Sequence, residues 1–342
     1  MPEVLVVDDS AVVRQMMTSI LGVLPDMNVV TAADPMIAMR KIEQRRPDVI
    51  VLDIEMPRMN GLVFLRKIMS EDPIPVVICS SMTTANSEGS MQALQLGAVD
   101  VLLKPRLLTD AAVLLVDTIR AAAQANVGRR VRRGAVPLNS LPEHRRSPGL
   151  VVIGASTGGT EALKIVLDAM PADGPPMAIV QHMPERFTSA FARRLNESSA
   201  MEVREARDGD LLRRGLALIA PGDKHLRVVR HPSGLVARVA AGELVSRHRP
   251  SVDVLFGSAA QVAGPSFVAV LMSGMGRDGA NGMMELRKAG AFTIAQDEST
   301  SVVFGMPRAA IEAGAACEVM AIERIADAIL SVPALRHPTN RA

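Results

Sequence analysis

The chain has 342 residues, of which 48% are hydrophobic and 22% charged, and its formal net charge is +2. This length suits two domains, and this composition indicates a folded protein and excludes a disordered one. No run approaches the roughly 18 apolar residues of a membrane span, and the start of the chain lacks a secretory leader. We expect a cytoplasmic protein without membrane insertion, in which Cys79 and Cys317 are reduced thiols in the core.

In residues 1–123, short apolar runs alternate with amphipathic segments. The apolar runs predict five strands, at residues 4–7, 29–31, 49–52, 76–79 and 101–103. The amphipathic segments predict five helices, at residues 12–24, 36–44, 62–69, 88–96 and 111–123. The alternation predicts an α/β domain with a doubly wound parallel sheet, in which sites form at the carboxyl ends of the strands.

Polar side chains stand at the ends of these predicted strands. Asp8 and Asp9 follow the first strand and Asp53 follows the third, so three carboxylates should converge. Oxygen-only clusters suit Mg²⁺, and Ser80 and Lys104 on the last two strands could complete a pocket for a phosphoryl group. An acidic pair or a lysine alone is usually a solvated surface group, but the set on successive strand ends favours a site.

These residues make residues 1–123 similar to a response-regulator receiver domain. The matching motifs are VVDDS at 6–10, LDIEMP at 52–57, GL at 61–62 and KP at 104–105. The resemblance implies a flavodoxin-like fold and a chemotaxis histidine kinase as phosphodonor. It also implies these roles: Asp53 the phosphoacceptor; Asp8, Asp9 and Asp53 ligands of Mg²⁺; Ser80 the switch hydroxyl; Lys104 the phosphate contact.

The chain departs from the receiver pattern at one position. Many receivers have an aromatic switch residue three places before the lysine, where this chain has Val101. This departure puts an aromatic switch in doubt and leaves coupling through Ser80 and the following helix.

Residues 124–148 read as a basic linker. They hold six arginines and one acidic residue among scattered Pro, Asn and Ser. The arginines are either a solvated hinge or a docking strip for an acidic partner. Because the basic excess is confined to this segment, we do not expect a nucleic-acid partner.

Residues 149–342 return to the alternation of strands and helices. Strands are predicted at residues 151–153, 177–180, 216–220, 268–272 and 292–295, and a hairpin at 226–229 and 235–239. A second α/β domain with a doubly wound, Rossmann-like parallel sheet is therefore expected.

Ser156 follows the first of these strands within GASTG, the G-x-S-x-G spacing of a nucleophile elbow. His182 follows the second strand, and Asp278 lies in a glycine-rich bend. A neutral imidazole could accept the serine proton while a carboxylate fixes its tautomer, although this chain order differs from that of α/β-hydrolases. Taken singly, His182 could be structural and Asp278 a turn residue.

The sequence argues against two other kinds of site in this region, a nucleotide-binding loop and a zinc site. A dinucleotide or phosphate loop would need G-x-G-x-x-G or a P-loop lysine, and neither is present around Ser156. A zinc site would need closely spaced ligands, which His182, His225 and His248 do not provide. The sequence favours a catalytic set of Ser156, His182 and Asp278 over both of these sites.

Residues from about 149 to 332 resemble the catalytic domain of the chemotaxis protein-glutamate methylesterase family. The matching blocks are IGASTGGT at 153–160, QHMP at 181–184, APGDKH at 220–225, SGMGRDG at 273–279 and AQDESTSVVFGMP at 295–307. The resemblance implies these roles: Ser156 the nucleophile; His182 the general base; Asp278 its orienter; Thr157 a support for the histidine; the Met275 backbone an oxyanion donor.

This resemblance implies hydrolysis of glutamate γ-methyl esters on methyl-accepting chemoreceptors, with release of methanol and no cofactor. It further implies deamidation of receptor glutamines as a possible second activity, and a place at chemoreceptor arrays. We hypothesise that the unphosphorylated receiver occludes Ser156 and that the protein is a monomer. The alternative is a phosphorylation-controlled binding module whose esterase is inactive.

Overall fold

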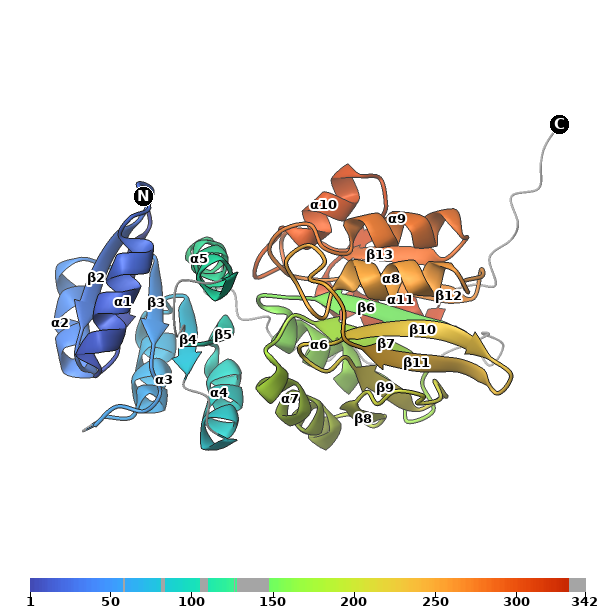
Figure 1. The fold of residues 1–342 in the computed structure, drawn as a ribbon, viewed down its shortest axis with the longest axis horizontal. Coiled ribbons are helices and arrows are strands. Elements are labelled where there is room, and N and C mark those ends of the chain that lie inside the picture. Colours follow the sequence, from blue (N-terminus) through green and yellow to red (C-terminus); the bar gives the residue numbers. More distant parts are fainter. Residues whose placement is uncertain (58, 81–83, 105–109, 126, 128–147, 332–342) are drawn as a thin grey trace. The chain divides into compact units, whose positions relative to one another are not determined.

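The chain folds into two compact units, Met1–Arg130 and Val131–Ala342. A computed structural model describes all residues except 58, 81–83, 105–109, 126, 128–147 and 332–342 (Figure 1). The predicted linker, residues 124–148, lies almost wholly outside the described residues. Each unit is therefore considered by itself.

The first unit is a five-stranded parallel sheet with helices between the strands (Figure 1). Its elements are β1 (Glu3–Val7), α1 (Ala11–Leu21), β2 (Asn28–Ala32), α2 (Pro35–Gln44), β3 (Val49–Leu52), α3 (Gly61–Glu71), β4 (Val76–Ser80), α4 (Thr84–Leu96), β5 (Asp100–Leu103) and α5 (Asp110–Ala123). The strand order β2-β1-β3-β4-β5 is the flavodoxin-like order, which confirms the fold expected for this unit.

Local sequence sets the starts of these helices. Ser10 and Asp34 precede α1 and α2, and their side chains accept hydrogen bonds from the backbone N–H groups of Val13 and Ile37. Such caps satisfy N–H groups that have no partner inside the helix. β1 and β3 are buried along their whole length, as expected for strands covered on both faces.

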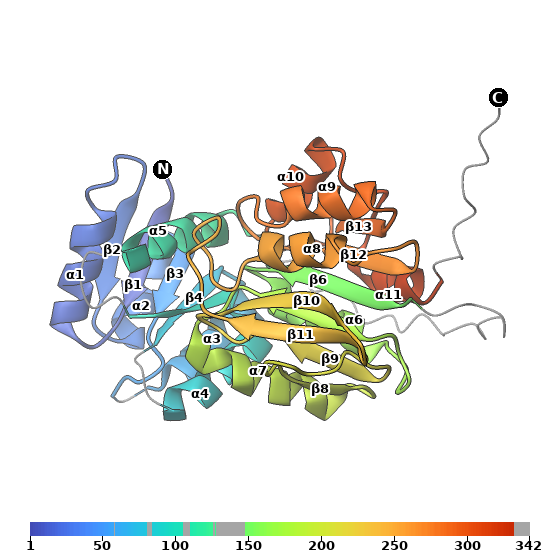
Figure 2. The same cartoon turned by 45° about the vertical axis from the view of Figure 1, so that its right-hand side comes forward.

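The second unit contains a seven-stranded parallel sheet (Figure 2). Its strands are β6 (Leu150–Ala155), β7 (Met177–Gln181), β8 (Glu202–Glu205), β9 (Leu216–Ile219), β12 (Phe267–Leu271), β13 (Phe292–Gln296) and β14 (Glu318–Met320). Its helices are α6 (Gly159–Asp168), α7 (Glu185–Ser198), α8 (Val252–Ala260), α9 (Ala280–Lys288), α10 (Met306–Glu312) and α11 (Ile322–Ser331). The parallel sheet with alternating helices confirms the α/β prediction, and β8 and β14 are edge strands that the sequence reading omitted.

The order β14-β13-β12-β6-β7-β9-β8 places β6 between β7 and β12. The chain leaves β6 toward β7 and later returns to the opposite side of β6 with β12. Ligands bind at such reversals, outside the carboxyl ends of the strands. Ser156 is the first residue after β6, so the fold places it at this reversal.

The predicted hairpin is also confirmed, as β10 (His225–His231) and β11 (Gly234–Ala240). Leu226, Val228 and Ala237 turn into the same apolar core as Phe256 of α8. The hairpin thereby fixes the position of residues 241–251, which connect β11 to α8. Among the described residues, no helix is long and apolar enough to cross a membrane.

Both cysteines are free thiols, but they differ in burial. Cys79 is buried in β4 as predicted, whereas Cys317 is exposed, so the prediction of a core thiol is wrong for Cys317.

Candidate active site and phosphoacceptor site

Adjacent strand ends bring Ser156 and His182 together. The register pairs Ala155 with Gln181, so the next residue on each strand is Ser156 and His182. The His182 N–H donates to the carbonyl of Ala155 at 3.0 Å. On the other side, the Ser156 N–H donates to the carbonyl of Ser273 at 2.9 Å. Ser156 is therefore held between the two strands that flank β6.

Glycines allow the close packing around Ser156. Gly158 has φ of 75°, and a Cβ there would lie 2.4 Å from Cβ of Val302. A Cβ on Gly274 would lie 2.7 Å from Cβ of Ser156. The turn therefore needs glycine both for its backbone conformation and for the approach of the 273–276 segment.

His182 is oriented by Asp278. Its Nε2 lies 2.8 Å from Oδ2 of Asp278. Its Nδ1 is buried and has no hydrogen-bond partner among the described residues. When the Nε2–H group of the neutral ring donates a hydrogen bond to the carboxylate, the lone pair of the ring lies on Nδ1. The free nitrogen is therefore the one able to accept a proton.

The charge of Asp278 is held at the amino end of α8. Besides His182, its carboxylate accepts hydrogen bonds from the Ser251 hydroxyl at 2.8 Å, the Val252 N–H at 2.7 Å and the Asp253 N–H at 3.0 Å. Burial alone would raise the pKa of Asp278, but the bond and charge of His182, together with the helix N–H groups, lower that pKa to about 2. Asp278 is therefore a fixed anion at neutral pH.

Thr157 and Met275 flank this centre. Thr157 is buried, and its carbonyl accepts a hydrogen bond from the Ser273 hydroxyl at 2.8 Å. The backbone before Met275 is fixed because the Gly274 carbonyl accepts from the Met306 N–H at 2.8 Å. The Met275 N–H makes no backbone hydrogen bond within the described part of the chain. A fixed free donor of this kind is what an oxyanion needs.

The predicted carboxylate cluster is present in the first unit. Asp8, Asp9 and Asp53 each offer an oxygen, and these oxygens lie within 4.8 Å of one another. Nζ of Lys104 lies 2.7 Å from both Asp8 and Asp53. Three carboxylates that converge without nitrogen or sulfur ligands fit a hard cation such as Mg²⁺.

Lys104 does not fully offset the effects of burial and of Asp8 on the pKa of Asp53. Burial raises the pKa of Asp53, and the neighbouring Asp8 adds to this effect against the hydrogen bond from Lys104. Burial opposes the charge of Lys104, but hydrogen bonds to Asp53 and Asp8 raise its pKa. Asp53 therefore ionises less readily than a solvated aspartate, despite its contact with Lys104.

Ser80 and Val101 lie on the last two strands of this unit. Ser80 ends β4, is buried and pairs in register with Leu103, directly before Lys104. Val101 is buried in β5 beside Ile78. The structure thus places Ser80 at the same sheet edge as Lys104, and an aliphatic side chain at the switch position.

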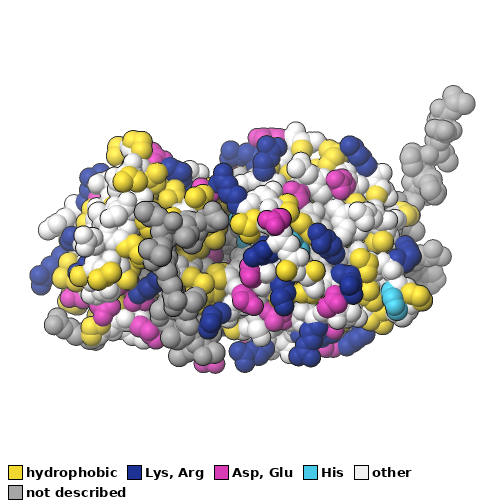
Figure 3. Space-filling view, viewed as in Figure 1, with side chains coloured by type: hydrophobic (Ala, Val, Ile, Leu, Met, Phe, Trp, Pro, Cys, Tyr) yellow, Lys and Arg dark blue, Asp and Glu magenta, His cyan; other side chains and the backbone are white. Residues whose placement is uncertain are grey.

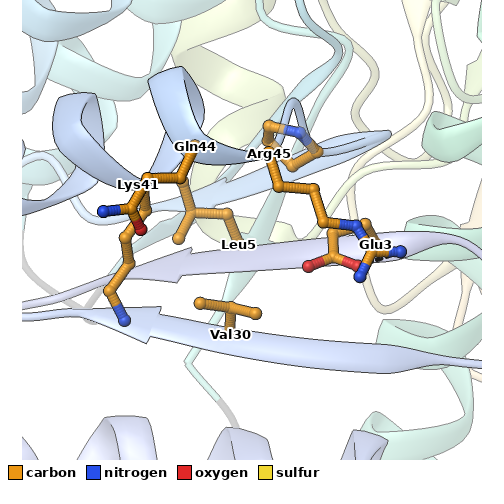
Figure 4. Close-up of a pocket in the computed structure, with 7 residues that line it drawn as sticks. Glu3, Leu5, Val30, Lys41, Gln44 and Arg45 are labelled. Carbon is orange, nitrogen blue, oxygen red and sulfur yellow. Dashed lines mark ion pairs between the residues drawn. The ribbon is translucent and has the colours of Figure 1, made fainter.

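A pocket of about 170 Å³ also occurs in the first unit, between β1, β2 and α2 (Figure 4). It lies at the start of β1, the opposite end from Asp8. Its charged side chains already have partners, since Arg45 pairs with Glu3 at 3.1 Å and Nζ of Lys41 donates to the Thr31 carbonyl at 2.8 Å. This pocket is not part of either site.

Comparison with known proteins agrees with this arrangement. The family model described as "CheB methylesterase" matches residues 151–329, and "Response regulator receiver domain" matches residues 4–113. The chain belongs to the CheB methylesterase family. The receiver match adds the response-regulator class to this membership.

Relatives resemble the chain along its whole length. A protein of Anaeromyxobacter dehalogenans named "Protein-glutamate methylesterase/protein-glutamine glutaminase 1" is 55% identical over 346 residues, which cover 96% of this chain and 99% of that protein. A second, numbered 2 and from Rhodospirillum rubrum, is 51% identical over 352 residues, which cover 96% and 97%. The crystal structure of the Thermotoga maritima CheB methylesterase catalytic domain matches with a TM-score of 0.52 and 36% identity, over 54% of this chain and 98% of that one.

Sequence reasoning missed the residues that hold the His182–Asp278 pair within this family site. Ser251 caps α8 and donates to Asp278, and the buried His225 accepts from the Ser251 N–H at 3.3 Å. His248 stacks on His182. The S-V-D start of α8 is a readable helix cap, but no sequence signal shows that the cap faces Asp278.

Proposed function

We propose that the protein is a serine esterase that hydrolyses glutamate γ-methyl esters on methyl-accepting chemoreceptors and also deamidates receptor glutamines. The observation that carries this proposal is the His182–Asp278 hydrogen bond, anchored at the amino end of α8 and placed one strand from Ser156. This arrangement supplies a nucleophile, a base and a permanent anion.

In the proposed acylation step, Nδ1 of His182 accepts the Ser156 hydroxyl proton while Oγ bonds to the ester carbonyl carbon. The C–OCH₃ bond then breaks, and methanol leaves with the proton from His182. Water repeats the sequence on the acyl-enzyme and releases the glutamate and Ser156. For a glutamine substrate the leaving group is ammonia. Asp278 stays ionised throughout and stabilises the imidazolium.

The tetrahedral intermediates carry a negative oxygen that needs donors. We propose that the Met275 N–H supplies one, because it is free and its segment is fixed against Ser156. Thr157 lies next to the nucleophile at the start of the turn and, in our proposal, supports the position of His182. Neither role requires a cofactor.

We also propose that Asp53 accepts a phosphoryl group from a chemotaxis histidine kinase. Asp8, Asp9 and Asp53 would hold Mg²⁺, which neutralises phosphoryl charge when bound. Lys104 would contact the phosphoryl group, and the Ser80 hydroxyl would act as the switch. The switch would work without an aromatic side chain, because position 101 is a valine. Each tenfold rise in activity needs only about 1.4 kcal/mol of differential stability.

The proposed partners are proteins, and the proposed place is the cytoplasmic side of chemoreceptor arrays, with the chain as a monomer. Basic and acidic side chains are interspersed on the face in view (Figure 3). Such a mixed surface lacks the single-sign field of a nucleic-acid interface.

The proposal is tested by methanol release from a methylated chemoreceptor. We expect Ser156→Ala to lower turnover by about 10⁴–10⁶-fold, because the variant lacks the hydroxyl that forms the proposed acyl-enzyme. The matched control is Ser233→Ala, at an exposed serine in the β10–β11 turn, which should leave turnover unchanged. Undiminished turnover in Ser156→Ala, or none in the wild type, would favour the binding module.

A further inference from the structure

The ring of His248 lies flat against the ring of His182. The two ring centroids are 3.7 Å apart and the planes differ by 12°. His248 reaches this place from the segment between β11 and α8, whereas His182 follows β7. The stack therefore joins the proposed base to a distant part of the sequence.

The backbone next to His248 has a conformation that non-glycine residues rarely adopt. Val245 and His248 exchange hydrogen bonds at 3.1 and 2.9 Å across a tight turn. The two residues of the turn, Ser246 and Arg247, have φ of 51° and 68°. Side chains disfavour this left-handed region, so such a turn persists only where its surroundings hold it.

Two contacts hold the rest of this segment. Nε2 of the buried His225 lies 2.8 Å from the carbonyl of Glu243. Nε of Arg249 donates to the carboxylate of Asp223 at 2.9 Å. The segment is thus fixed on both sides of the turn, and the ring of His248 is presented from a rigid support.

The His248 ring is uncharged at neutral pH. Burial lowers its pKa to about 3, and the proximity of His182 adds to this lowering. Asp278 acts in the opposite direction and Arg247 in the same direction as His182. A neutral ring places no second positive charge against His182 when His182 takes up the serine proton.

The stack supplies a restraint that Asp278 cannot supply. One hydrogen bond at Nε2 fixes that atom but allows the plane of the His182 ring to tilt, which would change the direction in which Nδ1 points. A ring stacked on its face removes this tilt. The π-face also attracts a cationic ring and excludes water from it.

We propose that His248 is a positioning residue that holds the plane of the His182 ring and thereby the direction in which Nδ1 points. This inference rests on the proposed esterase function. It predicts that an aromatic ring is needed at position 248, whereas its nitrogen atoms are not.

The test uses the full chain activated with an acyl phosphate and Mg²⁺, and measures methanol release. His248→Ala should lower kcat by about 10–100-fold and leave KM within about threefold, because the base is misplaced and substrate binding is not. His248→Phe should return kcat to within about fivefold of the wild type. His231→Ala, at an exposed histidine of the hairpin, is the matched control and should leave kcat unchanged.

A second measurement does not depend on activity. The proton on Nε2 of His182 that bonds Asp278 should give a slowly exchanging low-field NMR resonance in the Ser156→Ala background. Adding His248→Ala should speed its exchange with water, and adding His248→Phe should not.

Wild-type kcat in His248→Ala, kcat in His248→Phe as low as in His248→Ala, or an unchanged exchange rate would each overturn the inference. If Ser156→Ala retained activity, the proposed function would fail instead. The exchange rates of the Nε2 proton would still test whether the His248 ring positions His182.

Discussion

Each unit holds a buried carboxylate, Asp53 directly after β3 and Asp278 in the bend between β12 and α9, and the surroundings shift the two pKa values in opposite directions. Asp278 meets the first N–H groups of α8 together with Ser251 and His182, and these bonds lower its pKa to about 2. Asp53 shares one lysine with Asp8, and burial raises its pKa. Asp278 is therefore ionised at neutral pH, as its proposed role beside His182 requires. Asp53 is ionised less readily than a solvated aspartate, and in the proposed function it accepts a phosphoryl group together with Mg²⁺.

Among changes at these two carboxylates, the largest effect is expected at Asp278. Asp278→Asn should lower methanol release by about 10⁴-fold, because an amide can hold the wrong tautomer of His182. Asp173→Asn, at an exposed carboxylate paired with Arg214, is the matched control and should have wild-type turnover. Activity within tenfold of the wild type in Asp278→Asn would show that this carboxylate does not orient the base.

A smaller effect on methanol release is expected when Mg²⁺ is withheld from Asp53. Removal of Mg²⁺ by chelation should abolish the activation of the chain by an acyl phosphate, by tenfold or more, because the carboxylate cluster then repels the phosphoryl group. Basal methanol release should not change, since the proposed esterase steps use no metal. A fall in basal turnover on chelation would place a metal in the second unit.

The depressed pKa of Asp278 predicts a dependence of stability on pH. Its folded value of about 2, against roughly 3.9 unfolded, contributes about 2–3 kcal/mol to the second unit. This stability is present above about pH 4 and is lost as the pH falls toward about 2. Urea unfolding of residues 149–331, followed by circular dichroism because the chain lacks Trp and Tyr, measures this dependence. Equal acid slopes in the wild type and Asp278→Asn would contradict it.

The raised pKa of Asp53 predicts the opposite dependence for the first unit. Its protonated form is favoured by folding, so this contribution is present below the unfolded pKa and is lost as the pH rises through the folded value. Asp53→Asn should remove this decline. The effect should be smaller than that of Asp278, and hydrogen exchange of β3 amides in the full chain, without Mg²⁺, measures it. A variant with the same decline as the wild type would assign it to other groups.

The fold was predictable because its signals are local. The buried strands are continuous apolar runs in the sequence, and Ser10 and Asp34 cap the helices that follow them. The short edge strand Glu318–Met320 escaped because two of its residues are exposed and it lacks such a run. Edge strands take their identity from the neighbour they pair with, and that neighbour is distant in sequence.

The candidate site divides in the same way. Ser156 and His182 were found because each follows a strand, and Asp278 because it lies in a recognisable glycine-rich block. The helix start at Ser251 and the stacking ring of His248 could not be assigned to the site, because the folded hairpin and α8 bring them there. Groups that react follow local rules, whereas groups that hold them depend on tertiary packing.

We propose that phosphorylation of Asp53 in the presence of Mg²⁺ controls catalysis at Ser156. The most direct test of this control is methanol release by the wild type and Asp53→Asn, each with and without an acyl phosphate in the presence of Mg²⁺. We predict that the phosphodonor raises the turnover of the wild type by tenfold or more and leaves Asp53→Asn at its basal rate. Equal activation of both proteins, or activation of neither, would contradict the account.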